Sequence, residues 1–416
     1  MELKRNERVV LINAVYGHGS TGTIVRDIEN ICFNTGINCY VASPDSKVKE
    51  AKNGYLIGNF FDHKVHAVLS RIHGKQAYFS YLSTWRLIKW IKKIKPDVVH
   101  LHNLHSNYVQ LNMLLKFLAK DNLNTVITLH DCWFYTGGCF HYAAVGCNKW
   151  LNDCKSCPKK KFDTPAYFGK KTDAILADRK KYLLSIPNLY ITGVSEWMAH
   201  EPQRSFLNKT PNYVIQNGVD LNVFKPSTSD IRQRLELDGK YVILGPANKW
   251  LLPINKNVLL SFITMMKDDE VLLLFGCSQD DCSYINELQV AKYKLIPYGF
   301  TSSRSELAAL YSMADVFVNT THEDSFSLIN IEAQACGTPV VTFDQTGPKE
   351  TVDNVNSFHV PVGEVEMLYD AVEKVRNNSS IESSKACRHF VEENYNIEKK
   401  YQLYIDLYRT IIYSNL

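Results

Sequence analysis

The sequence predicts an α/β protein made of two doubly wound parallel sheets. Its apolar runs are short and continuous, which is typical of parallel strands buried on both faces. These runs alternate with helical patterns, and the alternation restarts after Pro226. The chain of 416 residues is long enough for two domains. We therefore expect one domain over residues 1–220 and a second over 221–385.

The first half opens on a nucleotide-binding pattern. Residues 8–14 form an apolar run, residues 16–23 a glycine-rich turn, and residues 24–30 have helical spacing. An amphipathic helix is expected at 82–95, with Leu87, Trp90, Ile91 and Ile94 on one side. Further strands are expected at 38–43, 97–102, 124–130 and 189–194.

The second half repeats the alternation. Helical patterns are expected at 304–313 and 327–335, and the stretch 384–415 also has helical character. Strands are expected at 241–245, 271–276, 294–298, 316–318 and 339–343.

An acidic loop and a helix start lie between two of these strands. Asp324 and Glu332 are separated by seven residues, and Asp324 follows a strand on the side where open α/β sheets bind ligands. The backbone N–H groups of Ser327 and Leu328 open the helix and suit a diphosphate. Glu332 could accept hydrogen bonds from two hydroxyls, as of a ribose. A plain surface loop with a carboxylate near a helix start would show the same pattern.

The segment E-D-S-F-S-L-I-N-I-E-A-Q-A-C-G-T-P-V-V-T-F at 323–343 closely resembles the glutamate-x7-glutamate signature of family-4 retaining glycosyltransferases. It is most similar to a branch that assembles capsule, exopolysaccharide and colanic-acid-type polymers. The resemblance implies the GT-B fold, in which two Rossmann-like domains face a central cleft. Five further segments are similar to motifs of that branch and occur in its order: 12–22, 96–103, 128–133, 193–197 and 216–220.

The resemblance implies roles for matching residues. Glu332 would hold the ribose, while Asp324 and Glu323 would lie near the reacting face of the donor sugar. Ser327 and Leu328 would offer N–H groups to the phosphates. His130 matches the active-site histidine of the family and follows a buried strand. The family also implies that the C-terminal helix, 386–416, returns to the first domain.

A basic pair after the first strand of the second domain is also expected from the family. Lys256 matches its second member, whereas the usual Arg is missing and Lys249 is the nearest candidate. A lysine can neutralise phosphate but lacks the bidentate fork of arginine. Cations and helix N-termini stabilise a leaving diphosphate, and no Asp-x-Asp pattern is present, so we expect no catalytic metal. Gly19 and Ser20 begin a tight turn expected to approach donor phosphate or acceptor.

Cysteines are concentrated in a segment of about 132–158 that is similar to an insertion in the same branch. The pair Cys154-x2-Cys157 has the spacing of half a zinc site. With Cys139 and Cys147 it could form a structural zinc site of four thiolates. Free thiols and disulfides are the alternatives.

The pattern of charge bears on partners and location. Residues 1–220 hold 29 Lys and Arg against 17 Asp and Glu, and the remainder 18 against 26. Residues 60–95 mix aromatic and basic side chains, as would an interfacial helix on an anionic membrane or a packed helix with a lysine-rich exterior. No nucleic-acid recognition motif accompanies the charge. The N-terminus lacks a signal-peptide pattern, so we expect a cytoplasmic protein, at most peripheral to the membrane.

The resemblance implies that this chain is a retaining glycosyltransferase. It would move a sugar from a nucleotide-sugar donor, a UDP- or GDP-sugar, to a glycan or lipid-linked saccharide in cell-surface polysaccharide biosynthesis. A nucleotide-sugar epimerase on the same fold and a non-catalytic nucleotide-sugar-binding subunit are the alternatives.

Overall fold

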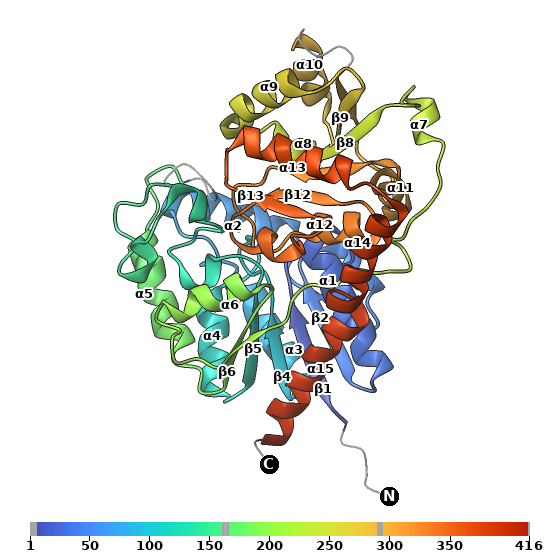
Figure 1. Cartoon of the computed structure of the whole chain (residues 1–416). Coiled ribbons are helices and arrows are strands. Elements are labelled where there is room, and N and C mark those ends of the chain that lie inside the picture. Colours follow the sequence, from blue (N-terminus) through green and yellow to red (C-terminus); the bar gives the residue numbers. More distant parts are fainter. Residues whose placement is uncertain (1–5, 160–162, 164–165, 289–293, 415–416) are drawn as a thin grey trace, which may run out of the picture. The chain divides into compact units, whose positions relative to one another are not determined.

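The computed structural model describes residues 6–159, 163, 166–288 and 294–414. Its internal contacts divide the chain into two compact units (Figure 1). Unit 1 comprises Met1–Asn217 and Lys400–Leu416, and unit 2 comprises Gly218–Lys399. Each unit has its own parallel sheet with helices on both faces, as the sequence predicted.

The sheet of unit 1 has seven parallel strands within the described residues, in the order β3-β2-β1-β4-β5-β6-β7. The order reverses between β1 and β4, which is a topological switch point of the kind that binds ligands. Sequence patterns did not predict β3 and β7, which are three-residue edge strands without a fully buried residue. The strands are β1 (Arg8–Ile12), β2 (Asn38–Ser43), β3 (Gly54–Leu56), β4 (Val98–Leu101), β5 (Asn124–Leu129), β6 (Leu189–Gly193) and β7 (Asn212–Val214).

Helices connect these strands. The amphipathic helix expected at 82–95 is confirmed as α3: Leu87, Ile91 and Ile94 are buried, and the Trp90 ring stacks on Tyr55 with centroids 4.6 Å apart. The α-helices of unit 1 are α1 (Gly19–Asn34), α2 (Phe60–His73), α3 (Tyr81–Ile94), α4 (Leu111–Lys120), α5 (Thr172–Leu183), α6 (Glu196–Gln203) and most of α15 (Ile397–Ser414).

The glycine-rich segment near the N-terminus differs from the expectation. Residues 19–22 are not a separate tight turn but the first turn of α1, and the loop lies before them. Gly22 approaches the loop closely, because an added Cβ would lie 3.2 Å from the Tyr16 nitrogen. A backbone hydrogen bond from Gly17 N to Gly22 O, at 2.9 Å, holds the loop against the first turn of α1.

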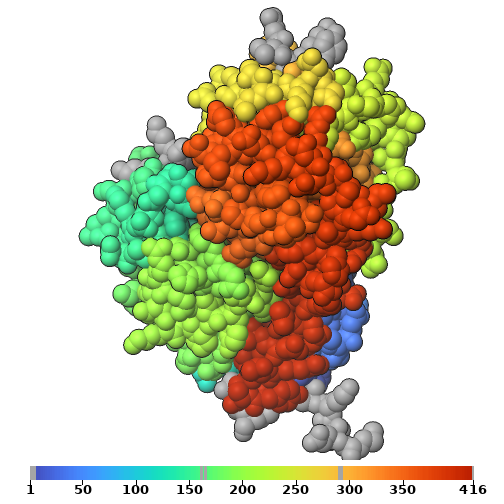
Figure 2. Space-filling model, in the orientation of Figure 1, coloured from blue at the N-terminus to red at the C-terminus, as the bar shows by residue number. Residues whose placement is uncertain are grey.

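The C-terminal helix α15 lies along the outside of unit 1, in dark red in Figures 1 and 2. Its buried tyrosines bond to the sheet: Tyr408 Oη lies 2.6 Å from His100 Nδ1, and Tyr404 Oη lies 3.1 Å from Thr128 Oγ1. These bonds connect β4 and β5 to a segment about three hundred residues away along the chain.

The helical stretch expected at 384–415 is broken in the structure. It forms α14 (Ile381–Asn394) in unit 2 and then α15. Between them the chain pairs with Val219: Val219 N donates to Tyr395 O at 2.8 Å, and Ile397 N donates to Val219 O at 3.2 Å. The segment that packs in unit 1 therefore begins at Lys400, not at residue 386.

We predict that Tyr408→Phe destabilises unit 1 by about 1–3 kcal/mol, because it leaves the buried His100 Nδ1 without its partner. Urea denaturation followed by tryptophan fluorescence would measure this. The matched control is Tyr213→Phe at an exposed tyrosine, for which we expect almost no change. Equal stability of Tyr408→Phe and the native chain would contradict the prediction.

The sheet of unit 2 has six parallel strands among the described residues, in the order β10-β9-β8-β11-β12-β13. The strands are β8 (Tyr241–Pro246), β9 (Glu270–Phe275), β10 (Leu295–Tyr298), β11 (Val316–Asn319), β12 (Val340–Phe343) and β13 (Phe358–Val360). The α-helices besides α14 are α7 (Ile231–Arg234), α8 (Ala247–Trp250), α9 (Lys256–Met265), α10 (Gln279–Glu287), α11 (Arg304–Met313), α12 (Leu328–Ala335) and α13 (Val365–Asn377).

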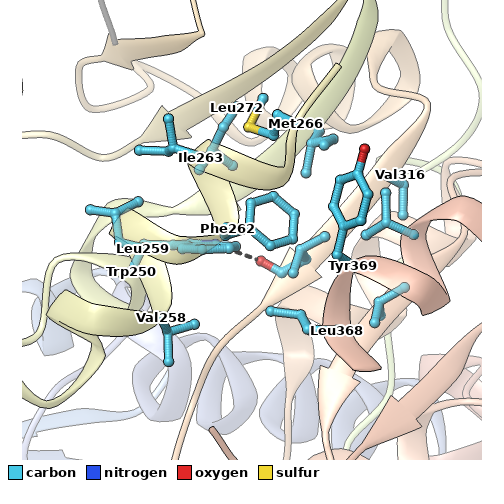
Figure 3. Close-up of a cluster of buried hydrophobic side chains, with 14 of the residues drawn as sticks. Trp250, Val258, Leu259, Phe262, Ile263, Met266, Leu272, Val316, Leu368 and Tyr369 are labelled. Atoms are coloured by element: carbon cyan, nitrogen blue, oxygen red, sulfur yellow. Dashed lines mark hydrogen bonds between the residues drawn. The ribbon is translucent and has the colours of Figure 1, made fainter. Parts of the chain in front are cut away.

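A buried tryptophan organises the core on one face of this sheet (Figure 3). Trp250 is fully buried against Phe262, with ring centroids 5.1 Å apart, and its Nε1–H donates to Val318 O at 3.0 Å. Gly245 is required beside it, since an added Cβ would lie 2.2 Å from Trp250 Nε1. The segment that follows β8 is thus held against β11.

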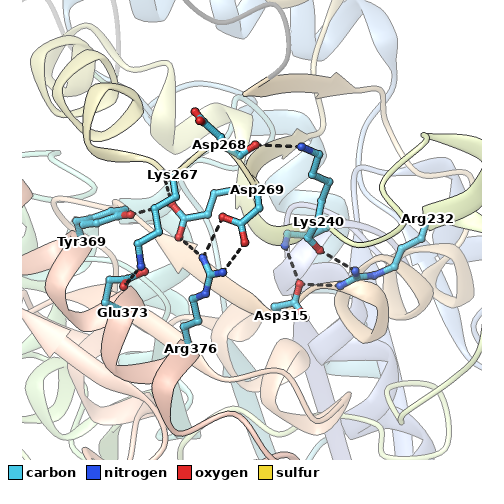
Figure 4. Close-up of polar contacts among 11 residues, drawn as sticks. Arg232, Lys240, Lys267, Asp268, Asp269, Asp315, Tyr369, Glu373 and Arg376 are labelled. Carbon is cyan, nitrogen blue, oxygen red and sulfur yellow. Dashed lines mark hydrogen bonds and ion pairs between the residues drawn. The ribbon is translucent and has the colours of Figure 1, made fainter.

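Charged residues at the amino ends of the strands form ion pairs (Figure 4). Arg232 Nη2 lies 2.7 Å from Asp315 Oδ2, just before β11. Arg376 Nη1 lies 2.8 Å from Glu270 Oε1, and Tyr369 Oη donates to the other oxygen of Glu270 at 2.8 Å. Glu270 is fully buried, so these partners offset the cost of burying its charge. The ion pairs at this amino edge stabilise the fold. The candidate site residues lie at the opposite, carboxyl edge of the sheet.

Candidate active site

At the carboxyl edge of the unit 2 sheet, a buried asparagine fixes the start of α12. Asn319, the last residue of β11, donates its side-chain N–H groups to Ser327 Oγ at 3.0 Å and to Asn330 Oδ1 at 2.9 Å. Asn330 donates in turn to Thr351 Oγ1 at 2.9 Å. The Ser327 side chain is therefore turned toward the protein, and the backbone N–H groups that open α12 remain at the carboxyl edge.

The acidic loop before α12 is held by its backbone. Thr346 Oγ1 accepts from Asp324 N at 3.1 Å and donates to Asp324 O at 2.7 Å. Thr346 has a φ of +49°, a strained conformation for a residue with a side chain. Gly347 packs against the same loop so closely that a Cβ would lie 2.0 Å from Ser325 O. The backbone of Asp324 and Ser325 is thus held by an unusually tight contact.

One polar atom of this loop has no protein partner. Ser325 Oγ is buried and has no hydrogen-bond partner among the described residues. Buried hydroxyls are normally satisfied, so this orphaned group fits a loop whose hydrogen bonds are completed by a ligand or by water.

Glu332 lies on the second turn of α12 and is partly buried. Burial raises its pKa to about 7, and the nearby Arg304 and a hydrogen bond from Tyr311 only partly oppose this shift. The Tyr311 hydroxyl donates to Glu332 Oε2 at 3.2 Å. A carboxylate on a helix with a buried phenol behind it is oriented to accept hydrogen bonds from hydroxyl groups.

The two predicted lysines flank a buried asparagine. Asn255 Nδ2 donates to Lys249 O at 2.8 Å and to Thr320 O at 2.8 Å, while its Oδ1 lies 2.6 Å from His322 Nε2. Lys256 is exposed at the first position of α9. Asn255 therefore connects the basic segment to the loop after β11, which also carries Glu323 and Asp324.

In unit 1, His130 belongs to a row of histidines at the ends of β4 and β5. His102 Nδ1 lies 2.9 Å from His130 Nε2, and the two rings stack with centroids 5.2 Å apart. His100 follows on the other side of His102, with centroids 4.0 Å apart. Burial lowers the pKa of His130 to about 4, so its imidazole is neutral at pH 7 and can take part in hydrogen bonds without carrying charge.

The loop after His130 is braced by a buried arginine. Arg179 of α5 donates to Thr136 O at 2.6 Å and to Trp133 O, and its guanidinium lies 3.8 Å from the centre of the Trp133 ring. Asp131, next to His130, accepts from Trp133 N at 2.8 Å and pairs with His105 Nε2 at 3.1 Å. These contacts hold the backbone around His130 in place.

The four cysteines predicted as zinc ligands all belong to unit 1. All eleven cysteines lie in the described residues and are free thiols. Cys139 shares a hydrogen bond with Cys157, but no three His, Cys, Asp or Glu side chains in the described ranges are placed to hold a metal ion. Cys147 is half-buried in a loop while Cys139 and Cys154 are buried. The structure therefore does not show the four-thiolate site that the spacing suggested, and that site stays a prediction.

The two parallel sheets, with a helix start and a carboxylate at a carboxyl edge, belong to the doubly wound α/β class, which binds ligands at that edge. Two family models match the chain: "Glycosyltransferase Family 4" over residues 34–223 and "Glycosyl transferases group 1" over residues 258–396. The chain thus belongs to the group 1, family-4 glycosyltransferases and is a glycosyltransferase.

Two similar proteins share less than 30% of their residues with the chain. The chain is 23% identical over 308 residues to WcaC of Escherichia coli K12, named as a colanic acid biosynthesis glycosyl transferase, and the match covers 72% of each chain. It is 29% identical over 205 residues to a probable sucrose-phosphate synthase of Thermosipho melanesiensis, covering 47% of this chain and 46% of that one.

Solved structures confirm the GT-B fold. Sucrose-phosphate synthase from Thermosynechococcus elongatus superposes with a TM-score of 0.68 at 16% identity, covering 98% of this chain and all of that one. HepE from Anabaena, solved in complex with UDP, superposes with a TM-score of 0.62 at 15% identity, covering 97% of this chain and all of that one.

Several site residues were not found from the sequence. Asn255, Arg304, Tyr311 and Asn319 have no special spacing, and they become visible only when the fold places them beside the acidic loop and Glu332. The signal that could have indicated Asn319 is a polar residue at the end of an otherwise apolar strand.

We predict that Asn319→Leu destabilises unit 2 by about 2–4 kcal/mol, because Ser327 and Asn330 lose their buried donor. Differential scanning calorimetry would measure the shift. Asn377→Leu at an exposed position of α13 is the matched control, and its transition should not move. A similar transition temperature for both variants would rule out the proposed importance of this network.

Proposed function

We propose that this glycosyltransferase uses a UDP- or GDP-sugar and transfers the sugar, with retention of anomeric configuration, to a glycan or lipid-linked saccharide during cell-surface polysaccharide biosynthesis. The observation that carries the proposal is the carboxylate of Glu332 on α12, a helix whose N-terminus is fixed at the carboxyl edge of the sheet. The names of two similar proteins support it: HepE was solved with UDP and with UDP-glucose, and WcaC is named for colanic acid biosynthesis.

In this proposal, unit 2 holds the nucleotide. Glu332 accepts hydrogen bonds from the two ribose hydroxyls, and the N–H groups at Ser327 and Leu328 bind the diphosphate. Lys249 and Lys256 add positive charge to the same phosphates. They neutralise the negative charge that develops when the bond between the anomeric carbon and the diphosphate breaks. The proposal therefore needs no metal ion.

The remaining residues act near the sugar. The acceptor hydroxyl attacks from the face that the diphosphate leaves, and its proton passes to the leaving phosphate oxygen. Glu323 and Asp324 lie at the sugar end of the loop in this scheme. The neutral imidazole of His130 hydrogen-bonds to a sugar hydroxyl, and His102 fixes its orientation. Gly19 and Ser20, at the start of α1, belong to the acceptor side.

We also propose a cytoplasmic location. The free thiols of the chain are the state that a reducing compartment maintains. Among the helices of the described residues, none is both long and apolar enough to cross a membrane.

The donor is identified by a thermal-shift screen against UDP-, GDP-, ADP- and dTDP-sugars. We expect one nucleotide family to raise the transition temperature of the native chain. With Glu332→Ala or Lys256→Ala, about tenfold or more ligand should be needed for the same rise in transition temperature, since each variant removes a direct contact. The exposed Ile381→Ser is the control. Absence of stabilisation by every nucleotide sugar would overturn the proposal, and binding without transfer or hydrolysis would make the chain a non-catalytic subunit.

Donor affinity should depend on pH through Glu332. Its pKa of about 7 in the empty site means that it is largely protonated below neutrality, whereas both ribose hydroxyls require the carboxylate. The Kd for intact UDP-glucose, or for the nucleotide sugar found above, should be constant above about pH 8. Below about pH 6, this Kd should approach an increase of about tenfold for each unit by which the pH falls. Titration calorimetry would follow this.

Glu332→Gln is the matched variant for this experiment. Because the amide does not titrate, we expect weaker binding at every pH and a nearly flat pH profile. A slope that persists in Glu332→Gln would show that another group is responsible.

A further inference from the structure

The helix α2 is amphipathic with its polar face inward. Phe61, Val65, Val68 and Ile72 form one stripe along it, and their exposed fractions are 79%, 57%, 54% and 37%. Such an outward apolar stripe is the opposite of the arrangement expected for a surface helix of a soluble domain.

The inward face of α2 is held by polar contacts. His66 is fully buried, with its Nδ1 2.8 Å from Ser80 Oγ. His63 Nε2 lies 3.0 Å from Ile57 O, and Ser70 Oγ donates to Asn107 Oδ1 at 3.1 Å. The orientation of the helix is therefore fixed by its hydrogen bonds, and the outward position of the apolar stripe is a property of the fold.

The exposed apolar area extends beyond the stripe. Phe60, beside Phe61, is 68% exposed. Tyr167 and Phe168 are 70% and 78% exposed, and Tyr167 N donates to Arg71 O at 2.8 Å, which places this pair against the end of α2. We call Phe60, Phe61, Val65, Val68, Ile72, Tyr167 and Phe168 the α2 surface. Contiguous apolar areas of this kind mark sites of interaction.

Cations surround the α2 surface. Lys64 Nζ lies 5.2 Å from the centre of the Phe60 ring, and Arg71 is exposed on α2 itself. At the end of the helix, a hollow is lined by His73, Lys75 and Lys171 together with Tyr78 and Tyr81.

The charged side chains of this region are nearly all positive. Residues 59–95, which include α2 and α3, contain eight Lys and Arg and a single acidic residue, Asp62. On α3, Tyr81, Leu82 and Trp85 are 62%, 55% and 44% exposed, and Lys89 Nζ lies 3.6 Å from the centre of the Trp85 ring. Exposed aromatic side chains with lysines above them are the composition of helices that lie in a lipid interface.

We propose that the α2 surface docks this protein on an anionic lipid bilayer. The apolar stripe enters the boundary between headgroups and acyl chains, and Lys64, Arg71, Lys75 and Lys171 bind the anionic headgroups. Charge decides against a second copy of this chain as the occupant. A self-complementary contact through this face would bring the same cations against one another.

The test is flotation of the purified native chain with vesicles. One set is phosphatidylcholine alone and the other contains about 30% phosphatidylglycerol. We expect binding to the anionic vesicles that is at least about tenfold stronger than to the neutral ones, and that weakens in about 0.5 M NaCl.

Two variants separate the apolar and the electrostatic contributions. Phe60→Ser with Phe61→Ser should reduce binding to anionic vesicles by about tenfold or more through lost apolar burial. Lys64→Glu with Arg71→Glu should reduce it by at least a similar factor through repulsion. Since all four side chains are exposed, both variants should keep the native circular dichroism spectrum. Ile381→Ser, an exposed apolar residue of unit 2, is the control and should bind like the native chain.

Three outcomes would overturn the proposal. The first is equal binding to neutral and anionic vesicles or to neither, and the second is binding that the α2 variants leave unchanged. The third is a native dimer in sedimentation velocity that the Phe60→Ser, Phe61→Ser variant dissociates, which would identify a second copy as the occupant. None of these measurements uses a nucleotide sugar, so the result is independent of the donor experiments.

Discussion

The candidate nucleotide site depends on the side-chain amide of Asn319. From the end of β11 it donates to both Ser327 and Asn330 and so determines where α12 begins and how it is rotated. Rotation matters because it decides whether Glu332 is directed toward the carboxyl edge or into the core. The partners of Asn319 are themselves buried and bonded, through Asn330 to Thr351. Loss of any one of these partners would leave a buried polar group without a hydrogen bond in a low-dielectric interior. The network therefore specifies this arrangement as well as stabilising it.

In unit 1, too, buried polar side chains form hydrogen bonds with one another, and here they include histidines and tyrosines. A parallel sheet covered on both faces would normally be apolar throughout, but β4 and β5 carry His100 and Thr128, whose polar atoms are bonded by Tyr408 and Tyr404 of α15. The last residues of the chain therefore satisfy polar groups in the centre of the sheet. Burial also lowers the pKa of His130, so that packing keeps its imidazole neutral at physiological pH.

The two edges of the unit 2 sheet illustrate why charge alone does not locate a site. The amino edge has several ion pairs, such as Arg376 with Glu270, and these pairs hold strands and helices together. The carboxyl edge has the orphaned Ser325 hydroxyl, the strained Thr346 and a carboxyl group with a raised pKa. Unsatisfied and strained groups persist where a ligand completes them.

The sequence by itself determined the α/β class, most strand positions and the family, because these depend on local apolar runs and on short motifs such as 323–343. Tertiary structure alone decided the break at Tyr395, where pairing with Val219 overrides a continuous helical pattern. It also decided that Arg304 and Tyr311 lie beside Glu332. The apolar stripe of α2 shows why such features cannot be decided from the sequence alone. Helical periodicity reveals that a stripe exists, but only the contacts made by the opposite face determine whether that stripe is directed inward or outward.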